Sequence, residues 1–181
     1  MNAPPKAIGL FPSLLGGAFD DLPVEIKTIH GGTSGHWYGT ASVRRPSAGP
    51  GRWIATLARF PAATAVAPCD VQIDVTREQE QWTRRFGDGR PLRSTLYSAH
   101  DCLVEKMGLI ALTFRLVPGT HGVEWALQRG ALLGVRVPRR LFAVVARSES
   151  CADGYRFTVR VSVLGVGELI AYDGVLHVRG S

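Results

Sequence analysis

Cysteine, lysine and long apolar runs are all scarce in this chain of 181 residues. Its three cysteines, Cys69, Cys102 and Cys151, are widely spaced and form no Cys-x-x-Cys pair. This spacing argues against a disulfide framework and a structural zinc site, so we expect a cytoplasmic protein. No apolar run is long enough to cross a membrane as a helix, so we expect no membrane span. The first residues, Met1–Lys6, lack the apolar core of a signal peptide.

Positive charge is carried almost entirely by arginine, because lysine occurs only at positions 6, 27 and 106. The formal net charge of +6 raises the possibility of nucleic-acid binding. No helix-turn-helix pattern, aromatic RNA-binding strand or zinc finger accompanies the charge. We therefore expect no nucleic-acid partner, and attribute the arginines to a composition typical of high-GC bacterial coding.

The N-terminal segment favours helix. Apolar residues recur at helical spacing over residues 12–30, with Ser13 as a plausible cap and Pro23 at the start of a second short helix. The glycines of "GGTSG" end this segment because they tolerate backbone conformations that stop a helix. A strand follows at residues 36–45.

From Cys69 onward, short strands alternate with turn signals. About nine sequential strands predict one antiparallel sheet that curls on itself into a closed or nearly closed β-barrel, with the N-terminal helix packed against or capping it. The fold class is α+β, and residues 1–181 form one domain. The predicted strands are 69–76, 80–86, 92–98, 102–108, 110–117, 122–133, 141–150, 155–163 and 168–178.

One predicted hairpin contains two arginines that can lie opposite each other. The stretch "EQWTRRFGDGRPLRSTLY" predicts two strands joined by a Gly-Asp-Gly turn. Period-two alternation puts Trp82, Arg84 and Phe86 on one face. If the turn is centred between its Asp and its second Gly, Arg93 lies opposite Arg84 on that face. Two opposed cations beside aromatic rings are unfavourable unless an anion lies between them.

The following strand supplies a carboxylate, since Glu105 can lie near Arg93 in an antiparallel neighbour. One interpretation is an anion-binding spot in the barrel, where Arg84 and Arg93 hold an oxyanion and Glu105 orients them or moves a proton. The other is a structural Arg–Glu network near the barrel rim. If the alternation is reversed, Thr83 and Arg85 point inward and the anion site is lost.

Aromatic residues are spread over many of the predicted strands, as the lining of one shared interior requires. A cavity and a solid aromatic core are both compatible with this distribution, and a curled sheet of about nine strands favours the cavity. The candidate substrate-binding residues are Trp82, Phe86, Tyr97, Phe114, Trp125 and Tyr172, and Trp37, Trp53 and Phe157 belong to the same aromatic set.

Two histidines in "HGGTSGHWYG" are candidates for acid–base chemistry. They are His30 and His36; histidine is the residue type that titrates near neutrality, and Asp20 or Asp21 could orient one of them. We take His30 as the candidate catalytic residue; the alternative is a helix-terminal histidine that binds a backbone carbonyl. No His-x-His or His-Glu-x-x-His pattern is present, so we expect no metal and no other cofactor.

Motifs distributed over nearly the whole chain resemble the bacterial domain of unknown function numbered 4166. That family is often fused behind a saccharopine-dehydrogenase-like or other nucleotide-binding reductase, which is absent here, and Met107-Gly108 stands where the family usually has Phe-Gly. The resemblance implies one domain and a possible reductase partner, and implies no reaction. The motifs are Leu22-Pro23, His30-Gly31, Gly39-x-Ala41, Trp82-x-Arg84-x-Phe86-Gly87, Arg93-Ser94-x-Leu96, Val104-Glu105, Pro138-x-x-Leu141, Asp153-Gly154-x-x-Phe157 and Tyr172-x-Gly174.

These observations predict a small barrel that encloses an apolar, partly anionic organic molecule. The leading hypothesis is a cofactor-independent isomerase or cyclase of bacterial secondary metabolism, with Glu105, Arg84, Arg93 and His30 as its catalytic residues. The alternative is a non-catalytic module that binds or carries a hydrophobic ligand for a separate reductase. We expect a monomer or a homodimer.

Overall fold

The computed structural model describes residues 9–132 and 134–178. Met1–Lys6, on which the argument about a signal peptide rests, lie outside these residues. Among the helices that are described, none has both the length and the apolar character needed to cross a membrane. The helical segments are α1 (Leu10–Leu15), the 3₁₀ turn η1 (Gly16–Phe19), α2 (Val24–His30), α3 (Gly49–Leu57) and the 3₁₀ turn η2 (Arg139–Leu141).

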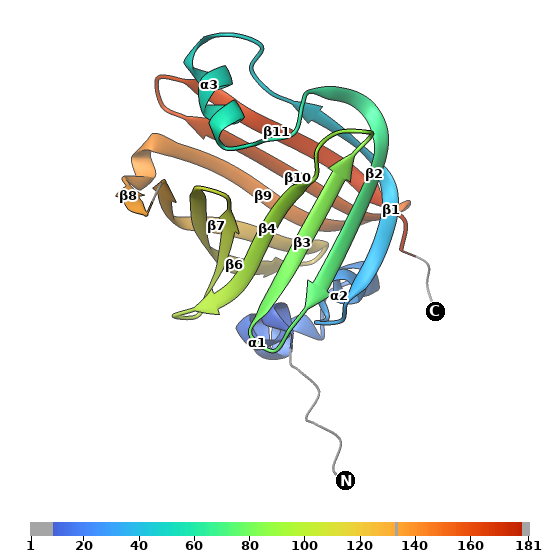
Figure 1. Cartoon of the computed structure of the whole chain (residues 1–181). Coiled ribbons are helices and arrows are strands. Elements are labelled where there is room, and N and C mark those ends of the chain that lie inside the picture. Colours follow the sequence, from blue (N-terminus) through green and yellow to red (C-terminus); the bar gives the residue numbers. More distant parts are fainter. Residues whose placement is uncertain (1–8, 133, 179–181) are drawn as a thin grey trace.

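Eleven antiparallel strands form the body of the molecule, and ten of them close into a barrel (Figure 1). Neighbours follow the chain from β1 to β7; β7 then pairs with β9, β9 with β10, β10 with β11 and β11 with β1. The expected α+β barrel is confirmed, although the short strand β8 was not predicted. The strands are β1 (Gly35–Arg44), β2 (Thr64–Val75), β3 (Gln79–Phe86), β4 (Leu92–Ala99), β5 (Cys102–Met107), β6 (Ile110–Gly119), β7 (Gly122–Leu132), β8 (Val135–Val137), β9 (Phe142–Cys151), β10 (Gly154–Val163) and β11 (Gly167–Leu176).

Burial along the strands alternates with a period of two, which identifies the face that points into the barrel. On β3, Glu80, Trp82, Arg84 and Phe86 are buried, whereas Gln81 and its alternate neighbours face outward. The predicted orientation of the Trp82-x-Arg84-x-Phe86 face is therefore confirmed, and this strand places two charged groups among apolar ones.

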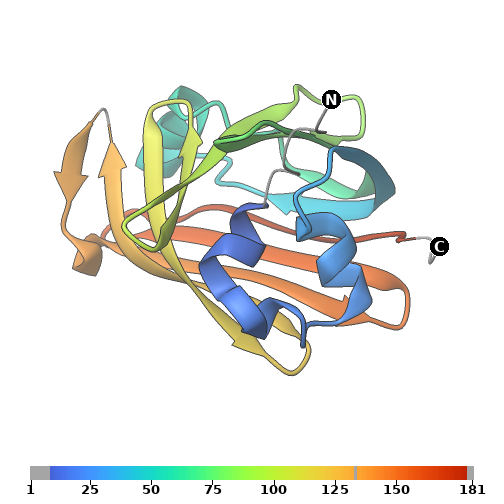
Figure 2. The same cartoon turned by 90° about the horizontal axis from the view of Figure 1, so that it is seen from below.

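The N-terminal helices close one end of the barrel, as expected (Figure 2). Helix α1 contacts β4, β5 and β6, and α2 contacts β9 and β10. Pro23 immediately precedes α2, as predicted. Ser13 is not a cap, however, because α1 already begins at Leu10 and the Ser13 hydroxyl donates a hydrogen bond of 2.8 Å back to the Leu10 carbonyl. Helix α3 lies at the other end of the barrel, beside β11 (Figure 1).

One stretch of the barrel wall is only partly paired. Strand β7 pairs with β9 over residues 122–124 and with β8 over residues 130–132. Between these ladders, residues 125–129 of β7 face the longer segment 138–146, which bows away from β7. We call the whole junction of β7 with β9, that is the short ladder at residues 122–124 together with this unpaired stretch, the β7–β9 seam. It is the part of the described wall where pairing between neighbouring strands of the barrel is shortest.

Candidate ligand-binding cavity

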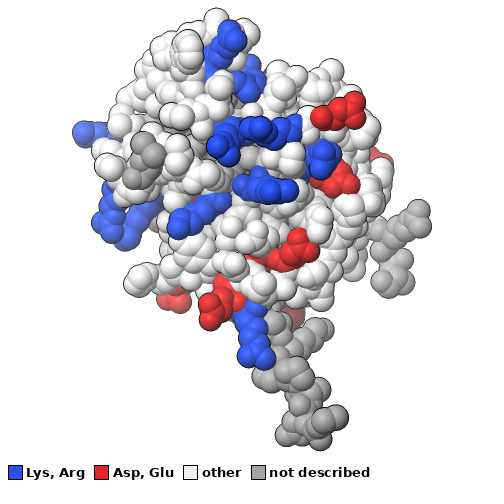
Figure 3. Space-filling view, viewed as in Figure 1, with Lys and Arg blue, Asp and Glu red and all other residues white. Residues whose placement is uncertain are grey.

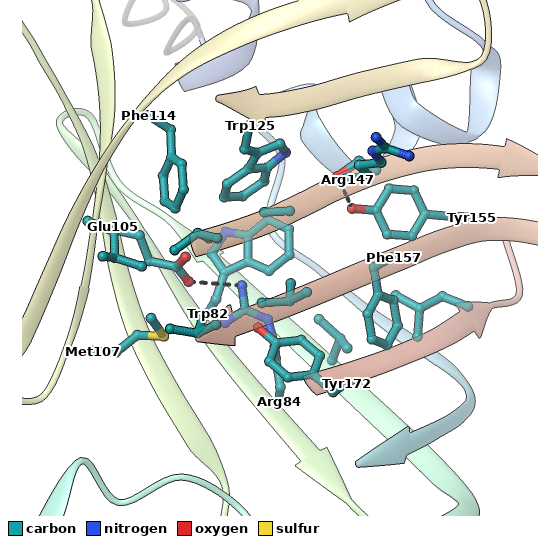
Figure 4. A pocket seen from close by; sticks show the side chains of 18 residues that line it. Trp82, Arg84, Glu105, Met107, Phe114, Trp125, Arg147, Tyr155, Phe157 and Tyr172 are labelled. Carbon is teal, nitrogen blue, oxygen red and sulfur yellow. Dashed lines mark hydrogen bonds and ion pairs between the residues drawn. The ribbon is translucent and has the colours of Figure 1, made fainter. Parts of the chain in front are cut away.

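A mostly apolar cavity with a volume of about 40 Å³ lies inside the barrel. Its walls come from β2, β3, β5, β6, β7, β9, β10 and β11 (Figure 4). Arg147 of β9 also belongs to the lining, although half of its side chain is exposed. The predicted cavity is present, and it is narrow.

Arg84 is the buried cation of this cavity. Its Nη1 donates a hydrogen bond of 2.9 Å to the Ser94 hydroxyl, and its Nη2 lies 3.2 Å from Glu105 Oε1. The guanidinium carbon lies 4.8 Å from the centre of the Trp82 ring, within the range of a cation–π contact. Arg84 and Glu105 are 7 % and 6 % exposed, so they form a buried ion pair.

The predicted opposition of Arg84 and Arg93 is wrong. Arg84 lies opposite Leu92, and Arg93 lies opposite Thr83 on the outer face of the barrel, where it is exposed. The turn between β3 and β4 is centred on Asp88, half a residue from the expected position, and such a slip moves every β4 side chain to the other face. At the cavity wall, Arg84 is therefore paired with the carboxylate of Glu105 instead of facing a second buried arginine.

The same slip accounts for Tyr97. Leu96 is fully buried and lies opposite Glu105, so its neighbour Tyr97 is half-buried on the outer face. Tyr97 was predicted to bind substrate, and the structure places it outside the cavity. Ser94 takes the inward position that had been expected for Arg93, and this is why it can accept a hydrogen bond from Arg84.

Most of the remaining aromatic candidates do face the interior. Phe114, Trp125 and Tyr172 line the cavity together with Trp82. Phe86 is buried and its ring centre lies 5.5 Å from that of Tyr172, but it is not part of the cavity wall. Two other members of the aromatic set lie in opposite environments. Phe157 lines the cavity, whereas Trp53 on α3 is 78 % exposed.

His30 is fully buried at the end of α2, behind the cavity wall. Its ring stacks on Phe11 at a centroid distance of 3.8 Å and on Trp82 at 5.4 Å. Its Nε2 is 2.9 Å from the Tyr155 hydroxyl, which is in turn 2.8 Å from the Ser148 hydroxyl. Burial, and next the charge of Arg84, lowers the pKa of His30 to about 3, so the ring is neutral near pH 7.

His30 and His36 do not form a pair, and neither Asp20 nor Asp21 orients His30. His36 is exposed on β1, where its Nε2 lies 2.7 Å from Asp70 and its Nδ1 lies 2.8 Å from the Tyr38 hydroxyl. The alternative interpretation of His30 as a helix-terminal residue holds for its position. Its partner is a side-chain hydroxyl, however, instead of a backbone carbonyl.

The two interior tyrosines are protonated hydrogen-bonding groups. Burial raises the pKa of Tyr172 to about 12 despite the opposing charge of Arg84, and burial likewise raises the pKa of Tyr155. For Arg84, burial lowers the pKa, but the surrounding Tyr172, Glu105 and Tyr155 together hold it above its ordinary value. The cavity therefore offers a permanently charged guanidinium, its carboxylate partner and phenolic hydroxyls.

A second buried carboxylate lies on β3. Glu80 is 1 % exposed and accepts a hydrogen bond of 3.0 Å from Trp82 Nε1. Burial raises the pKa of Glu80, while the bond from Trp82 opposes that change. This contact fixes the Trp82 ring, which forms part of the cavity wall and stacks on His30.

Several polar residues of the site escaped prediction. Ser94 would have been found with the correct hairpin register, and the alternation of "YRFTVRV" carried a signal that Tyr155 and Phe157 share a face. Ser148 and Arg147 had no such signal, because their roles arise from contacts across the barrel and at the seam. Glu80 did have one, because the alternation along β3 places it on the inward face of Trp82 and Arg84. In residues 9–132 and 134–178, no three His, Cys, Asp or Glu side chains are grouped as metal ligands would be.

Comparison with known proteins identifies the family. A family model described as "Domain of unknown function (DUF4166)" matches residues 22–176, which is most of the chain. The chain belongs to the DUF4166 family. No curated protein and no solved structure matches it. The match begins at Leu22 and ends at Leu176, so it takes in α2, the whole barrel and every cavity residue described above, while α1 precedes it.

Proposed function

We propose that this DUF4166 barrel binds a small, mostly apolar organic molecule that carries an anionic or polar oxygen, with Arg84 as the anchor. The observation that carries the proposal is a buried, charged guanidinium that faces a mostly apolar cavity. A guanidinium has five N–H donors. Ser94 and Glu105 accept two of them, so others remain for an oxygen of the ligand.

A purely structural role explains the ion pair less well. Burying two charges costs free energy, and well-packed apolar residues of similar volume are often as stable or more stable in their place. A cavity wall gives a reason to keep the pair, since a charged donor in an apolar surround binds an oxygen strongly.

The narrow cavity implies that a ligand displaces part of the wall. Ligand-binding pockets commonly measure about 300–1,000 Å³, which is more than the space inside this barrel. The β7–β9 seam supports such an opening, because its unpaired middle section adjoins the cavity at Trp125 and Ala146.

Affinity measurements with two probes test the anchor. Naphthalene-1-carboxylate should bind through Arg84, whereas naphthalene, which has no oxygen, should bind by apolar contact alone. Replacing the pair together, Arg84→Met with Glu105→Leu, should weaken carboxylate binding by about tenfold or more and leave naphthalene binding unchanged. The exposed pair Arg160–Glu168, replaced in the same way, is the control. Equal carboxylate affinity in the interior variant would reject Arg84 as the anchor.

Within this function, a cofactor-independent isomerase or cyclase is favoured by the position of Glu105. Its carboxylate lines the cavity beside Arg84, so it can move a proton while Arg84 holds an oxyanion. Arg93 has no part in this scheme because it lies outside, and His30 acts only through Tyr155. The alternative is a carrier module that presents its ligand to a separate reductase.

Exchange of the α-hydrogens of 2-tetralone with deuterated water distinguishes the two roles. An enzyme should accelerate the exchange, and Glu105→Gln should abolish the acceleration while 2-tetralone still binds. If the wild-type protein binds 2-tetralone without accelerating the exchange, the carrier role stands and the isomerase does not.

A further inference from the structure

Arg93, which is excluded from the interior, lines a surface hollow with two other arginines. Arg59, Arg90 and Arg93 surround about 360 Å³ of space between the end of α3, the β3–β4 turn and the β5–β6 turn. We call it the basic hollow. Its lining holds no carboxylate, and within the described residues none of the three guanidinium groups lies within 4.0 Å of one. Figure 3 shows basic side chains gathered across this face, with acidic ones towards its lower and right edges.

The backbone of Arg59 gives an independent indication of function. Arg59 follows α3 with a φ of 58°, in the left-handed region that usually holds glycine at the end of a helix. Any side chain here costs free energy relative to glycine. Strain of this kind at a non-glycine residue is a recognised feature of binding sites. Because glycine would fit this backbone better, we infer that arginine is present here for its guanidinium group.

Met107 connects the basic hollow to the interior. It is the residue common to the walls of the hollow and of the cavity, and it is 5 % exposed. Methionine has an unbranched side chain with several rotatable bonds, so it can swing aside at little cost. The Met107 side chain therefore lies between the three exposed arginines and the apolar space that contains Arg84.

We propose that the natural ligand of the barrel is an amphipathic phosphate. Its phosphate head binds Arg59, Arg90 and Arg93 in the basic hollow, and its apolar body passes Met107 into the cavity. Guanidinium groups suit phosphate because each can donate two parallel hydrogen bonds to it, and the three positive charges more than offset the double negative charge of a phosphate monoester. This inference rests on the proposed interior binding and adds a head group to the ligand.

Titrations with decyl phosphate, decanol and inorganic phosphate test the arrangement. The wild-type protein should bind decyl phosphate about tenfold or more tightly than decanol. Arg59→Gly combined with Arg93→Gln should remove that difference and leave decanol binding unchanged. Because Arg59→Gly relieves the backbone, misfolding cannot account for the loss. Arg115→Gln, an exposed arginine on β6, is the control for the change in charge.

Met107→Phe tests the path between the two sites. A bulkier, stiffer side chain should weaken decyl phosphate and decanol about tenfold while binding of inorganic phosphate stays at its wild-type level. Equal affinities of wild type and Met107→Phe for decyl phosphate would show that the chain does not pass this residue, and would overturn the proposed path.

The outcomes separate this inference from the proposed function. If the wild-type protein binds decanol but the arginine variants bind decyl phosphate as tightly as wild type, the phosphate site is wrong and interior binding survives. If decanol and decyl phosphate both fail to bind, the interior function itself is rejected. Sedimentation with vesicles containing phosphatidic acid identifies the source of the head group. Pelleting that the arginine variants lose indicates a membrane lipid, and no pelleting together with decyl phosphate binding indicates a free molecule.

Discussion

The wall formed by β3, β4 and β5 and the β7–β9 seam are two parts of one barrel with opposite properties. The β3–β4 ladder joins six residue pairs and the β4–β5 ladder five, whereas the β7–β9 ladder joins three. The continuous wall is also crossed on its inner side by the contacts of Arg84 with Ser94 and Glu105. At the seam, the Arg147–Glu124 pair is long, at 3.8 Å, and both side chains are about half exposed.

The difference shows how a barrel can be firm and adaptable at once. A buried charge needs fixed partners, and a wall with continuous ladders supplies them. Strand pairs with few backbone hydrogen bonds open at lower free-energy cost than the core of a sheet. The buried ion pair and the sparsely paired seam thus lie on different strands.

Breaking an ion pair in each wall should give the largest contrast. Glu105→Ala leaves the Arg84 charge buried and uncompensated, so we expect a loss of about 3–5 kcal/mol in the free energy of unfolding. Glu124→Ala at the seam should cost about 0–1 kcal/mol, because its partner Arg147 stays in water. Urea unfolding of the two variants and of wild type measures both. Similar small losses would mean that the interior pair is hydrated.

Acid should lower the free energy of unfolding through His30, which stacks on Trp82 of β3. The pKa of His30 is about 3 in the folded protein and 6.5 is its ordinary value, so the unfolded chain binds this proton more readily. Stability from neutral His30 is complete above pH 6.5 and is lost as the pH falls towards 3, by up to about 1.4 kcal/mol per pH unit.

His30→Phe keeps a ring between Phe11 and Trp82 but cannot bind a proton. Its unfolding free energy should therefore decline less steeply than that of wild type between pH 6.5 and 4. Parallel pH profiles for His30→Phe and wild type would show that His30 is not the group responsible.

A glycine-to-alanine substitution can push the two strands of the seam apart. A Cβ at Gly122 would overlap the Ser148 carbonyl oxygen, and one at Gly39 would overlap the Val175 carbonyl oxygen in the longer β1–β11 ladder. Both alanine variants should lose about 1–3 kcal/mol. In Gly122→Ala, hydrogen exchange should accelerate chiefly around residues 143–149. In Gly39→Ala it should accelerate through β1 and β11. The same exchange pattern in both would show that the seam is not an independent weak point.

The smallest expected effect is a gain. Arg59→Gly removes a side chain from a left-handed backbone position, so the free energy of unfolding should rise by about 0.5–1 kcal/mol. Thermal unfolding measures it, with Arg90→Gly, whose φ is not in that region, as the comparison. A loss of stability in Arg59→Gly would remove the argument that the arginine is kept for its function.

How far the sequence predicted the molecule depended on the range of the interactions involved. Alternation along each strand and the turns between strands are local, and they were enough for the barrel, its capping helices and the inward face of β3. The turn between β3 and β4 required more, because a shift in its centre moved Arg93 and Tyr97 outward and Ser94 inward. Glycine and proline at a turn do not determine its centre when several loop lengths fit.

The parts of the site that could not be predicted depend on closure of the ring. His30 meets Tyr155 from the far end of the chain, and Ser148 joins them from a third segment. No periodicity within one segment encodes such a meeting. The bowing of segment 138–146 could not be predicted either. Its sequence is that of an ordinary loop and strand, and the bow follows only from the registers of the two ladders on either side of it.

An antiparallel sheet can close only with an even number of strands, because each neighbour reverses direction. Eleven strands satisfy this rule here because β8 and β9 run in the same direction along β7 and occupy one position between them. Residues added to or deleted from the stretch between β8 and β9 would then alter the width of the β7–β9 seam without changing the topology. Under the proposed function, the length of that one connection sets the size of the molecule that the barrel accepts.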